Sequence, residues 1–282
     1  MNSGRVVSHA GFRLELSILR LEELLPHEET IPESVLKLKQ NLIEDGVQRD
    51  PIIIDSRTLT ILDGMHRHRA LTELSAKLGV VCRVDYSDSR VKVKRWLRSA
   101  KFDDKRVSEL SKTTGLRISM SRDEAIRLVD SRASVAALVR GRKALASLTA
   151  GGPFDSFSVV RSFDEYCKRS NIPVSIQTDD EGFPPDESHA TLYVPLPDKD
   201  DVVKAATLKR LFPPKSTRHL IPARPLGLGI PLDSLRNQSL MAQEQANAEL
   251  DRIIGNSKPT RLGPGSTYLG RKYEETIYVY GA

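Results

Sequence analysis

Short apolar runs alternate with amphipathic stretches in the first third of the chain, and this pattern predicts mixed strands and helices. The runs that are apolar, β-branched or regularly alternating predict strands at residues 12–21, 51–54, 58–62 and 80–84. Apolar positions between Ile31 and Ile43 follow helical spacing up to Gly46 and predict a helix. Residues 69–78 are rich in helix formers and end at Gly79, a typical helix stop. These elements predict a compact α/β unit from residue 12 to about residue 100.

After residue 100 the pattern mixes strands and helices without strict alternation, which favours the α+β class. Helices are expected at residues 103–112, 121–130, 157–169, 199–211 and 233–254. Strands are expected at residues 91–94, 174–177, 190–194 and 273–280. Residues 133–139 and 144–148 flank Gly141 and fit the strands of a hairpin, although their alanines also permit helix. Residues 255–270 are rich in Gly, Pro, Ser and Thr and predict an irregular connection. We therefore expect two domains, residues 1–100 and residues 101–282, the second ending in a helix and strand extension.

Composition narrows the class of protein. The chain has 282 residues, a formal net charge of +6 and two cysteines, neither in a metal-binding spacing, which excludes a zinc or disulfide scaffold. No apolar stretch reaches the ~20 residues that span a bilayer, and residues 1–11 lack a signal core, so we expect a cytoplasmic protein without a membrane partner. The basic residues 90–106 are interpreted as a solvated face, which disfavours nucleic acid as a partner.

Candidate chemistry is concentrated at the junction between a predicted strand and a predicted helix, where the chain reads Asp63-Gly64-Met65-His66-Arg67. The first N–H groups of a helix have no intrahelical partner and, together with the helix dipole, favour bound phosphate. We expect the backbone of Gly64, Met65 and His66 and the side chains of His66 and Arg67 to hold phosphate. Asp63 is either the N-cap of this helix or a ligand of Mg²⁺. The phosphate-binding motifs G-x-x-x-x-G-K-[ST] and strand-linked G-x-G-x-x-G are absent.

The letters of this turn resemble the Asp-Gly-x-His-Arg turn of free L-serine kinases, a branch of the ParB/sulfiredoxin superfamily. ParB partition proteins typically read Gly-Glu-Arg-Arg here, whereas this chain has Met65 and His66 in place of the Glu and the first Arg. Sulfiredoxins have their catalytic cysteine at the position of Met65, which excludes that reaction. The resemblance implies a ParB/sulfiredoxin-like nucleotide-binding domain in residues 1–100.

Two further segments support the kinase branch. Pro26-His27-Glu28 is similar to the segment that carries the catalytic glutamate, which would be Glu28, although Glu29 is a neighbour of the same type. Residues 212–219 are similar to the family segment Phe-x-Pro-Lys-[ST]-Thr-Arg-His, whereas composition alone favours a proline-stiffened turn. The residues that the resemblance assigns to serine binding are Trp96, Lys215, Ser216, Thr217, Arg218 and His219. It extends over residues 12–235, and from Asn237 onward the chain departs from the family.

The resemblance implies a kinase that moves a phosphoryl group from a purine nucleotide, ADP or ATP, to L-serine, with O-phospho-L-serine as product. Glu28 would accept the hydroxyl proton, His66 would contact the transferred group, and Asp63 would position Mg²⁺. Residues 212–219 are closer to the ADP-using form, whereas the C-terminal extension departs from it. The alternatives are a ParB-like, nucleotide-responsive DNA binder, with residues 107–116 as half of a helix-turn-helix, and a kinase for a related hydroxy amino acid such as threonine.

Overall fold

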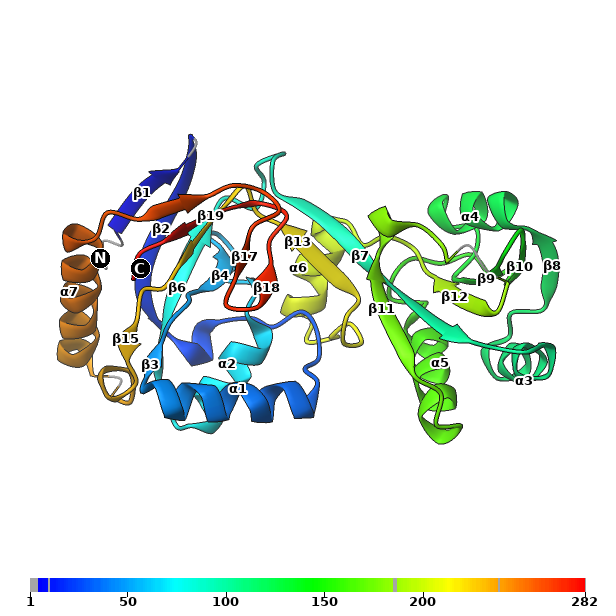
Figure 1. Cartoon of the computed structure of the whole chain (residues 1–282), viewed down its shortest axis with the longest axis horizontal. Coiled ribbons are helices and arrows are strands. Elements are labelled where there is room, and N and C mark those ends of the chain that lie inside the picture. The colour runs from blue at the N-terminus through cyan, green and yellow to red at the C-terminus, as the bar shows by residue number, and fades with distance from the viewer. Residues whose placement is uncertain (1–4, 10, 185–186, 238, 282) are drawn as a thin grey trace. The chain divides into compact units, whose positions relative to one another are not determined.

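The computed structural model describes residues 5–9, 11–184, 187–237 and 239–281 (Figure 1). Contacts between Cα atoms divide the chain into two units. The first unit consists of Met1–Lys92, Val203–Leu211 and His219–Ala282, and the second of Val93–Val202 and Phe212–Arg218. The boundary thus differs from the one expected near residue 100, because the C-terminal elements pair with strands and helices of the first unit. No helix in the described part of the chain is long and apolar enough to cross a membrane.

A five-stranded sheet forms the centre of the first unit. Its strands lie in the order β1 (Arg5–His9), β2 (Phe12–Arg20), β6 (Leu78–Val84), β4 (Ile52–Asp55) and β5 (Ile61–Asp63). Only β4 and β6 run parallel; the other neighbours are antiparallel. The apolar runs predicted as strands supply its buried side chains, and α1 (Pro32–Asp45) packs against α2 (Met65–Glu73). Gly46 ends α1 in the left-handed conformation, as predicted.

The second predicted helix of this unit is shorter than expected. It ends at Glu73, and Ser75 has a φ of 62°, so the prediction that it continues to residue 78 is wrong. Leu78 begins β6, which lies between β2 and β4. Gly79 therefore lies within a strand and does not end a helix. Glycine is favoured there because a Cβ would lie 2.6 Å from Leu21 Cδ2. Sheet pairing and close packing therefore override the helix propensity of residues 76–78.

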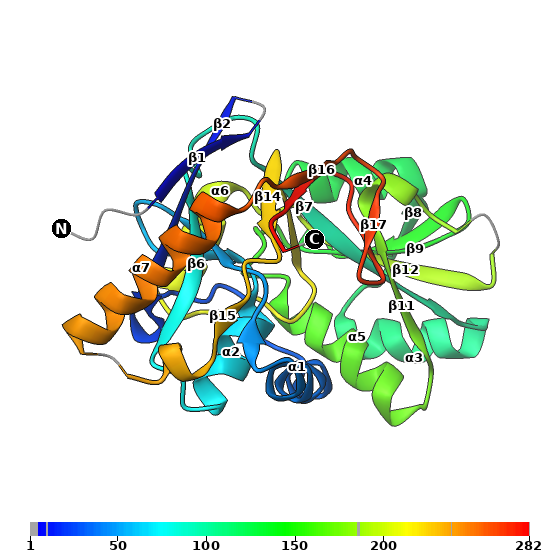
Figure 2. The same ribbon diagram turned by 60° about the vertical axis from the view of Figure 1, so that its left-hand side comes forward.

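The C-terminal elements belong to the first unit. A three-stranded sheet has the order β14 (Ala223–Leu226), β19 (Thr276–Val279) and β16 (Thr260–Leu262), and two strand pairs join β15 (Ile230–Pro231) to β3 (Val47–Gln48) and β17 (Thr267–Tyr268) to β18 (Arg271–Lys272). The helix α7 (Leu240–Asn256) packs on β2, as both views show (Figures 1 and 2). The expectation of an irregular connection over residues 255–270 is wrong, because β16 and β17 lie within it. Short 3₁₀ turns occupy Leu21–Glu23 and Asp233–Leu235.

The second unit is built on a larger sheet. Its strands lie in the order β11 (Val174–Thr178), β7 (Lys92–Lys101), β12 (His189–Tyr193), β9 (Ala137–Arg140), β10 (Lys143–Ala146) and β8 (Ile118–Ser121), and β13 (Thr217–Leu220) also pairs with β7. Its helices are α3 (Asp104–Thr114), α4 (Arg122–Asp130) and α5 (Phe157–Arg169). A 3₁₀ turn follows β11 at Asp179–Glu181, and α6 (Lys199–Thr207) crosses the boundary between the units. The α+β class and the hairpin around Gly141 are confirmed.

The helix-turn-helix considered for residues 107–116 is not formed. The helix α3 ends at Gly115, which is left-handed, and the next element is the strand β8. This strand pairs with β10 from Ser121 to Ile118, so its backbone is committed to the sheet. The next helix, α4 (Arg122–Asp130), is thus separated from α3 by a strand of the sheet, which is not the connection of a helix-turn-helix.

Candidate active site

The strand β5 ends at Asp63 and α2 begins at Met65, so the predicted turn lies at a helix N-terminus. Its N-cap is Gly64, with a φ of 99°, and no side chain caps the helix, which contradicts the N-cap role considered for Asp63. A Cβ on Gly64 would lie 3.0 Å from Arg67 Nη1 and 3.4 Å from Ile52 Cα. Glycine is required here by both the positive φ and the close approach of the neighbouring strand. The first-turn N–H groups of α2 have no partner within the helix.

The Asp63 carboxylate lies against arginines from the C-terminal part of the chain. Arg224 Nη1 donates to Asp63 Oδ2 at 2.5 Å, and Arg271 Nη1 lies 3.9 Å from the same oxygen. Arg224 also pairs with Glu275, so the buried guanidinium lies between two carboxylates. Burial raises the pKa of Asp63, but the positive charges of Arg224, Arg271 and Arg67 outweigh it and hold that pKa well below its usual range. Asp63 is therefore ionised at neutral pH.

The residues Asp63–Arg67, predicted to bind the phosphates of a phosphoryl donor, are called the donor turn below. The segment that carries Glu28 is attached at both ends to this turn or to the strand before it. On one side, Leu25 forms a parallel bridge with Thr60, and His27 Nδ1 lies 2.6 Å from the carbonyl oxygen of Ile61 in β5. On the other side, the Ile31 N–H donates to His66 Nε2 in the first turn of α2. Glu28 lies between these two anchors and is buried, whereas Glu29 is half-buried. The anchors hold residues 25–31 against β5 and the first turn of α2.

His66 and Arg67 have different surroundings, although both were expected to contact phosphate. Because His66 Nε2 accepts the Ile31 N–H, the ring is neutral and carries its proton on Nδ1. Arg67 Nη1 donates to the carbonyl of Pro51 at 2.7 Å, and Arg67 Nη2 lies 3.7 Å from Asp50 Oδ2. The Arg67 side chain thus fixes the turn to the chain before β4.

His219 was expected to bind serine, and both of its ring nitrogens contact the protein. Tyr86 Oη lies 2.8 Å from His219 Nε2, and the other nitrogen is bonded to the Leu62 backbone. Burial lowers the pKa of His219 well below its usual value, with a further contribution from the charged form of His27. The ring is therefore neutral, and it bonds to the backbone near the end of β5.

In the second unit, three residues assigned to serine binding gather around one aromatic ring. Lys215 Nζ and Arg218 Cζ each lie 5.5 Å from the centroid of the Trp96 ring. Arg218 Nη2 pairs with Asp180 Oδ2 at 3.1 Å, and Lys94 Nζ pairs with Asp180 Oδ1 at 2.8 Å. The cluster presents two cations and an aromatic face, which suits a small zwitterion or a phosphate.

The loop before β13 is shaped by a buried arginine that sequence reasoning missed. Arg98 on β7 donates to the carbonyls of Pro214 and Lys215, and Asp164 on α5 holds its Nε at 2.9 and 3.0 Å. Ser216 was expected to bind substrate, and its hydroxyl donates to the Pro213 carbonyl at 2.7 Å. Thr217, with the same expectation, is buried at the start of β13.

The sequence contains few signals for the residues that form ion pairs with the predicted site residues. Arg224 stands in a short apolar strand, and a charged residue in such a position is a usable signal of a buried ion pair. Asp180, Glu275 and Arg271 carry no comparable local signal. Their positions depend on contacts with residues that are between 38 and 208 positions away, which periodicity does not reveal.

The fit of Mg²⁺ rests on Asp63 and on the phosphates that it would face. No cluster of three or more His, Cys, Asp or Glu that could hold a metal ion occurs among the residues that the structure describes. Mg²⁺ often binds one or two carboxylates together with phosphate oxygens and waters, and an ionised Asp63 at the donor turn fits that pattern. One of its oxygens is already used by Arg224, which leaves the other for the ion.

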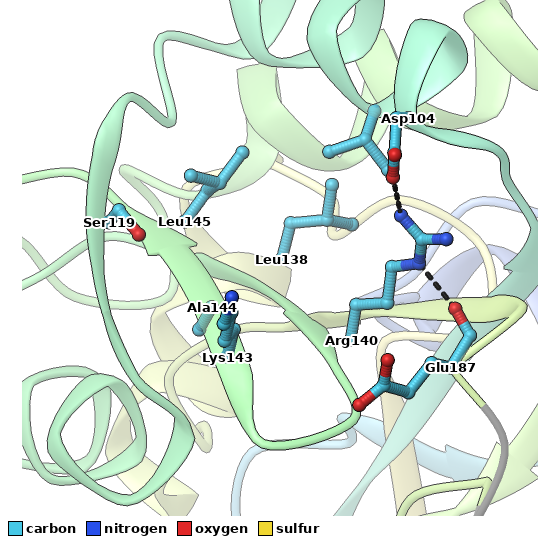
Figure 3. A pocket seen from close by; sticks show the side chains of 9 residues that line it. Asp104, Ser119, Leu138, Arg140, Lys143, Ala144, Leu145 and Glu187 are labelled. Carbon is cyan, nitrogen blue, oxygen red and sulfur yellow. Dashed lines mark hydrogen bonds and ion pairs between the residues drawn. The ribbon is translucent and has the colours of Figure 1, made fainter.

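Two cavities lie near charged side chains. One of about 270 Å³ in the first unit is lined by Asp50, Arg67 and Leu269 among others. The other, of about 420 Å³, lies in the second unit beside Arg140, which pairs with Asp104 and donates to the Glu187 carbonyl (Figure 3). None of the residues that line the second cavity was predicted to be functional, and apolar side chains from β9 and β10 form much of its floor.

Comparisons with known proteins bear on this geometry. No protein-family profile matches the chain. An ATP-dependent L-serine kinase of Staphylothermus marinus is 27% identical over 243 residues, 79% of this chain and 92% of the relative. An ADP-dependent L-serine kinase of Thermococcus kodakarensis is 24% identical over 231 residues, 79% of this chain and 94% of the relative. The solved structure of a free serine kinase in complex with AMP has a TM-score of 0.65 and 21% identity, and the match covers 83% of this chain and 96% of that one. These likenesses confirm the predicted resemblance to L-serine kinases and the fold.

Proposed function

We propose that this protein, which resembles L-serine kinases over 79% of its length, transfers a phosphoryl group from ADP or ATP to free L-serine. The observation that carries the proposal is the attachment of the Glu28 segment to the donor turn, through β5 on one side and His66 on the other. A carboxylate fixed beside a helix N-terminus combines a base with a phosphate site, which is what phosphorylation of an alcohol requires.

The first unit would hold the donor. Backbone N–H groups of Gly64, Met65 and His66 would bind the nucleotide phosphates, and His66, in the first turn of α2, would contact the transferred group. The anchored Arg67 would keep the turn rigid, with its positive charge close to the phosphates. A preorganised turn of this kind stabilises charge that develops in the transition state without reorganisation during the reaction.

Residues of the second unit, with His219, would hold the acceptor. The cations of Lys215 and Arg218 suit the serine carboxylate and, after transfer, the phosphate of phosphoserine. Trp96 would form an apolar wall for the small side chain. Ser216, Thr217 and His219 would shape the loop and strand that present these groups. Selection of serine over threonine would rest on the space left for one methyl group, which discriminates weakly.

In the reaction, Glu28 would orient the serine hydroxyl and accept its proton. The serine oxygen then forms a bond to the terminal phosphorus, and the bond from that phosphorus to the bridging oxygen breaks. The products are phosphoserine and either AMP from ADP or ADP from ATP. Mg²⁺, held by Asp63 and the donor phosphates, would supply charge neutralisation for the phosphates. A kinase of a free amino acid is expected to work in the cytoplasm.

The DNA-binding alternative is weaker. The kinase relatives match 79% of this chain, and α3 is followed by a strand instead of a second helix. Salt-dependent retention on immobilised duplex DNA separates the two functions, since a DNA binder loses affinity steeply with salt. We expect no retention at physiological salt.

The decisive assay incubates the protein with L-serine and either ADP or ATP, with and without Mg²⁺, and follows phosphoserine by ³¹P NMR. We expect phosphoserine with at least one donor and only when Mg²⁺ is present. Parallel reactions with L-threonine test the acceptor. If neither donor yields a phosphorylated amino acid, the proposal is wrong.

Replacement of the proposed base gives the sharpest prediction for the site. Glu28→Gln removes the proton acceptor and keeps the shape of the side chain, so we expect turnover to fall at least about 100-fold. Nucleotide affinity, measured by calorimetry, should change little, because the phosphate-binding backbone is untouched. The matched control is Glu29→Gln, which changes the neighbouring carboxyl and should remain active. Equal activity of Glu28→Gln and wild type would remove Glu28 from the mechanism.

A further inference from the structure

The donor turn has fewer available cationic groups than its sequence indicates. Arg67 donates to the Pro51 carbonyl and lies beside Asp50, and Arg224 is buried between Asp63 and Glu275. Both guanidinium groups are therefore compensated by protein acceptors. Nucleotide phosphates carry several negative charges, and their binding normally requires cations with N–H donors that can still bond to them.

Arg271, in the C-terminal extension, is a cation of that kind. Its Nη1 lies 3.9 Å from Asp63 Oδ2, an ion pair that is too long for a hydrogen bond, and 53% of its side chain is exposed. Its guanidinium lies over the buried Tyr273 ring, 4.8 Å from the centroid. Across the described ranges, no hydrogen bond from this guanidinium to another residue is found. Arg271 is thus held beside the donor turn with its N–H donors available.

The hairpin that carries Arg271 has a defined geometry. It consists of β17 and β18, drawn in red in Figure 1, joined by Leu269 and Gly270 with φ values of 46° and 77°. Two successive left-handed residues are typical of a tight type I′ turn. The Tyr273 N–H donates to the Ser266 carbonyl at 2.9 Å and closes the base of the hairpin. Leu269 lines the same cavity as Arg67, which locates the tip beside the donor turn.

We propose that this hairpin is part of the nucleotide site and that Arg271 is a phosphate-binding residue of the donor. The inference rests on the proposed function and gives a role to the chain from Asn237 onward, which lies outside the predicted resemblance to L-serine kinases. Asp63 and the stacked Tyr273 ring position the Arg271 guanidinium. When the nucleotide binds, Arg271 donates to a phosphate oxygen, and Asp63 keeps its buried partner Arg224.

The test is nucleotide binding, measured by calorimetry on the full chain with ADP and with adenosine. Arg271→Gln removes the charge and should weaken ADP binding about tenfold, the effect of one charge-assisted hydrogen bond. Adenosine has no phosphate, so its affinity should stay unchanged. Arg271→Lys keeps the charge but not the planar guanidinium, so its ADP affinity should lie between those of wild type and Arg271→Gln. The control is Lys272→Gln, which removes one positive charge from the adjacent strand residue, whose side chain points to the other face.

The outcomes separate this inference from the kinase proposal. If Arg271→Gln binds ADP with the same affinity as wild type, the inference is overturned, even if wild type makes phosphoserine. An equal loss of ADP and adenosine affinity also overturns it, since that loss would reflect altered folding, which the thermal unfolding midpoint checks. If ADP affinity depends on Arg271 but wild type makes no phosphoserine with either donor, the inference stands and the kinase proposal fails.

Discussion

Two buried histidines hold the end of β5, the strand that leads into the donor turn. His27 Nδ1 bonds to the carbonyl of Ile61, and His219 bonds to the backbone of the next residue, Leu62. The two rings meet edge to face, with centroids 5.4 Å apart. Burial lowers the pKa of His27 to about 4, although its bond to Ile61 opposes the shift. Both rings are therefore neutral in the folded protein at physiological pH.

This neutrality predicts an acid-dependent loss of stability. An unfolded His27 binds a proton near pH 6.5 and the folded one only near pH 4, so the unfolded state binds more protons between these values. The free energy of unfolding should therefore fall as the pH is lowered from about 6.5 to 4, with His27 contributing up to about 1.4 kcal/mol per pH unit. Urea unfolding across this range measures the slope. His27→Asn keeps a donor for Ile61 but does not titrate in this range, and it should flatten the slope; an unchanged slope would contradict the assignment.

At the scale of elements, α7 completes the hydrogen bonding of the central sheet. Within the described residues, the pairing of β1 with β2 extends from His9↔Phe12 to Arg5↔Leu16, and Ile18 lies beyond it. The Ile18 N–H donates to Asn247 Oδ1 at 2.9 Å, and Gln243 Nε2 donates to the Ile18 carbonyl at 2.9 Å. Side chains of α7 thus satisfy the backbone N–H and carbonyl of Ile18. Polar contacts as well as apolar packing therefore hold α7 on β2.

This arrangement predicts an uneven response to the same substitution on the two faces of α7. Asn247→Leu removes the acceptor of the buried Ile18 N–H and should destabilise the protein by about 1–3 kcal/mol. Gln245→Leu makes a matched change at an exposed position of the same helix and should stay within about 0.5 kcal/mol of wild type. Urea unfolding at neutral pH compares the two variants. Equal effects would show that the contact with Ile18 contributes nothing specific.

At the scale of the whole molecule, the first unit is assembled from separate stretches of chain. The end of β5 contacts the C-terminal strands, because Arg224 on β14 pairs both with Asp63 and with Glu275, the residue before β19. Leu226, Tyr273, Ile277 and Val279 form a small apolar core between these strands. The donor site therefore depends on the last residues of the chain, although its motif lies near residue 65.

Truncation after residue 256 tests this dependence. The shortened chain loses β16, β17, β18 and β19 and the burial of five apolar or aromatic side chains, a loss of roughly 10 kcal/mol for the first unit; these side chains are Tyr273, Ile277, Tyr278, Val279 and Tyr280. Hydrogen exchange should become faster in β14 and in the strands around the donor turn. Peptides of β9 and β10 in the second unit serve as the internal reference and should exchange as before. Unchanged protection of β14 would show that the C-terminal strands are dispensable for the first unit.

Local sequence determined much of this protein. Period-two and helical patterns located most strands and helices, and α5 has the bounds that its pattern predicts, because alternation and amphipathic spacing follow directly from strand and helix geometry. Residue identities in three segments also indicated phosphoryl transfer to serine, through their resemblance to L-serine kinases. The segments are Asp63–Arg67, Pro26–Glu28 and residues 212–219. The roles of single residues at these sites remain predictions, and the experiments above test them.

Tertiary structure decided what these patterns could not specify. The helix after Met65 stops at Glu73 because the following residues pair between two other strands, and Arg67 bonds to Pro51 instead of extending from the turn. Above all, only the fold brings Arg271 to Asp63, 208 positions away in sequence. A local pattern reports the face on which a side chain lies. Its partner depends on long-range strand pairing and packing, in which distant segments bury their apolar surface together and satisfy the charges that burial would otherwise leave uncompensated.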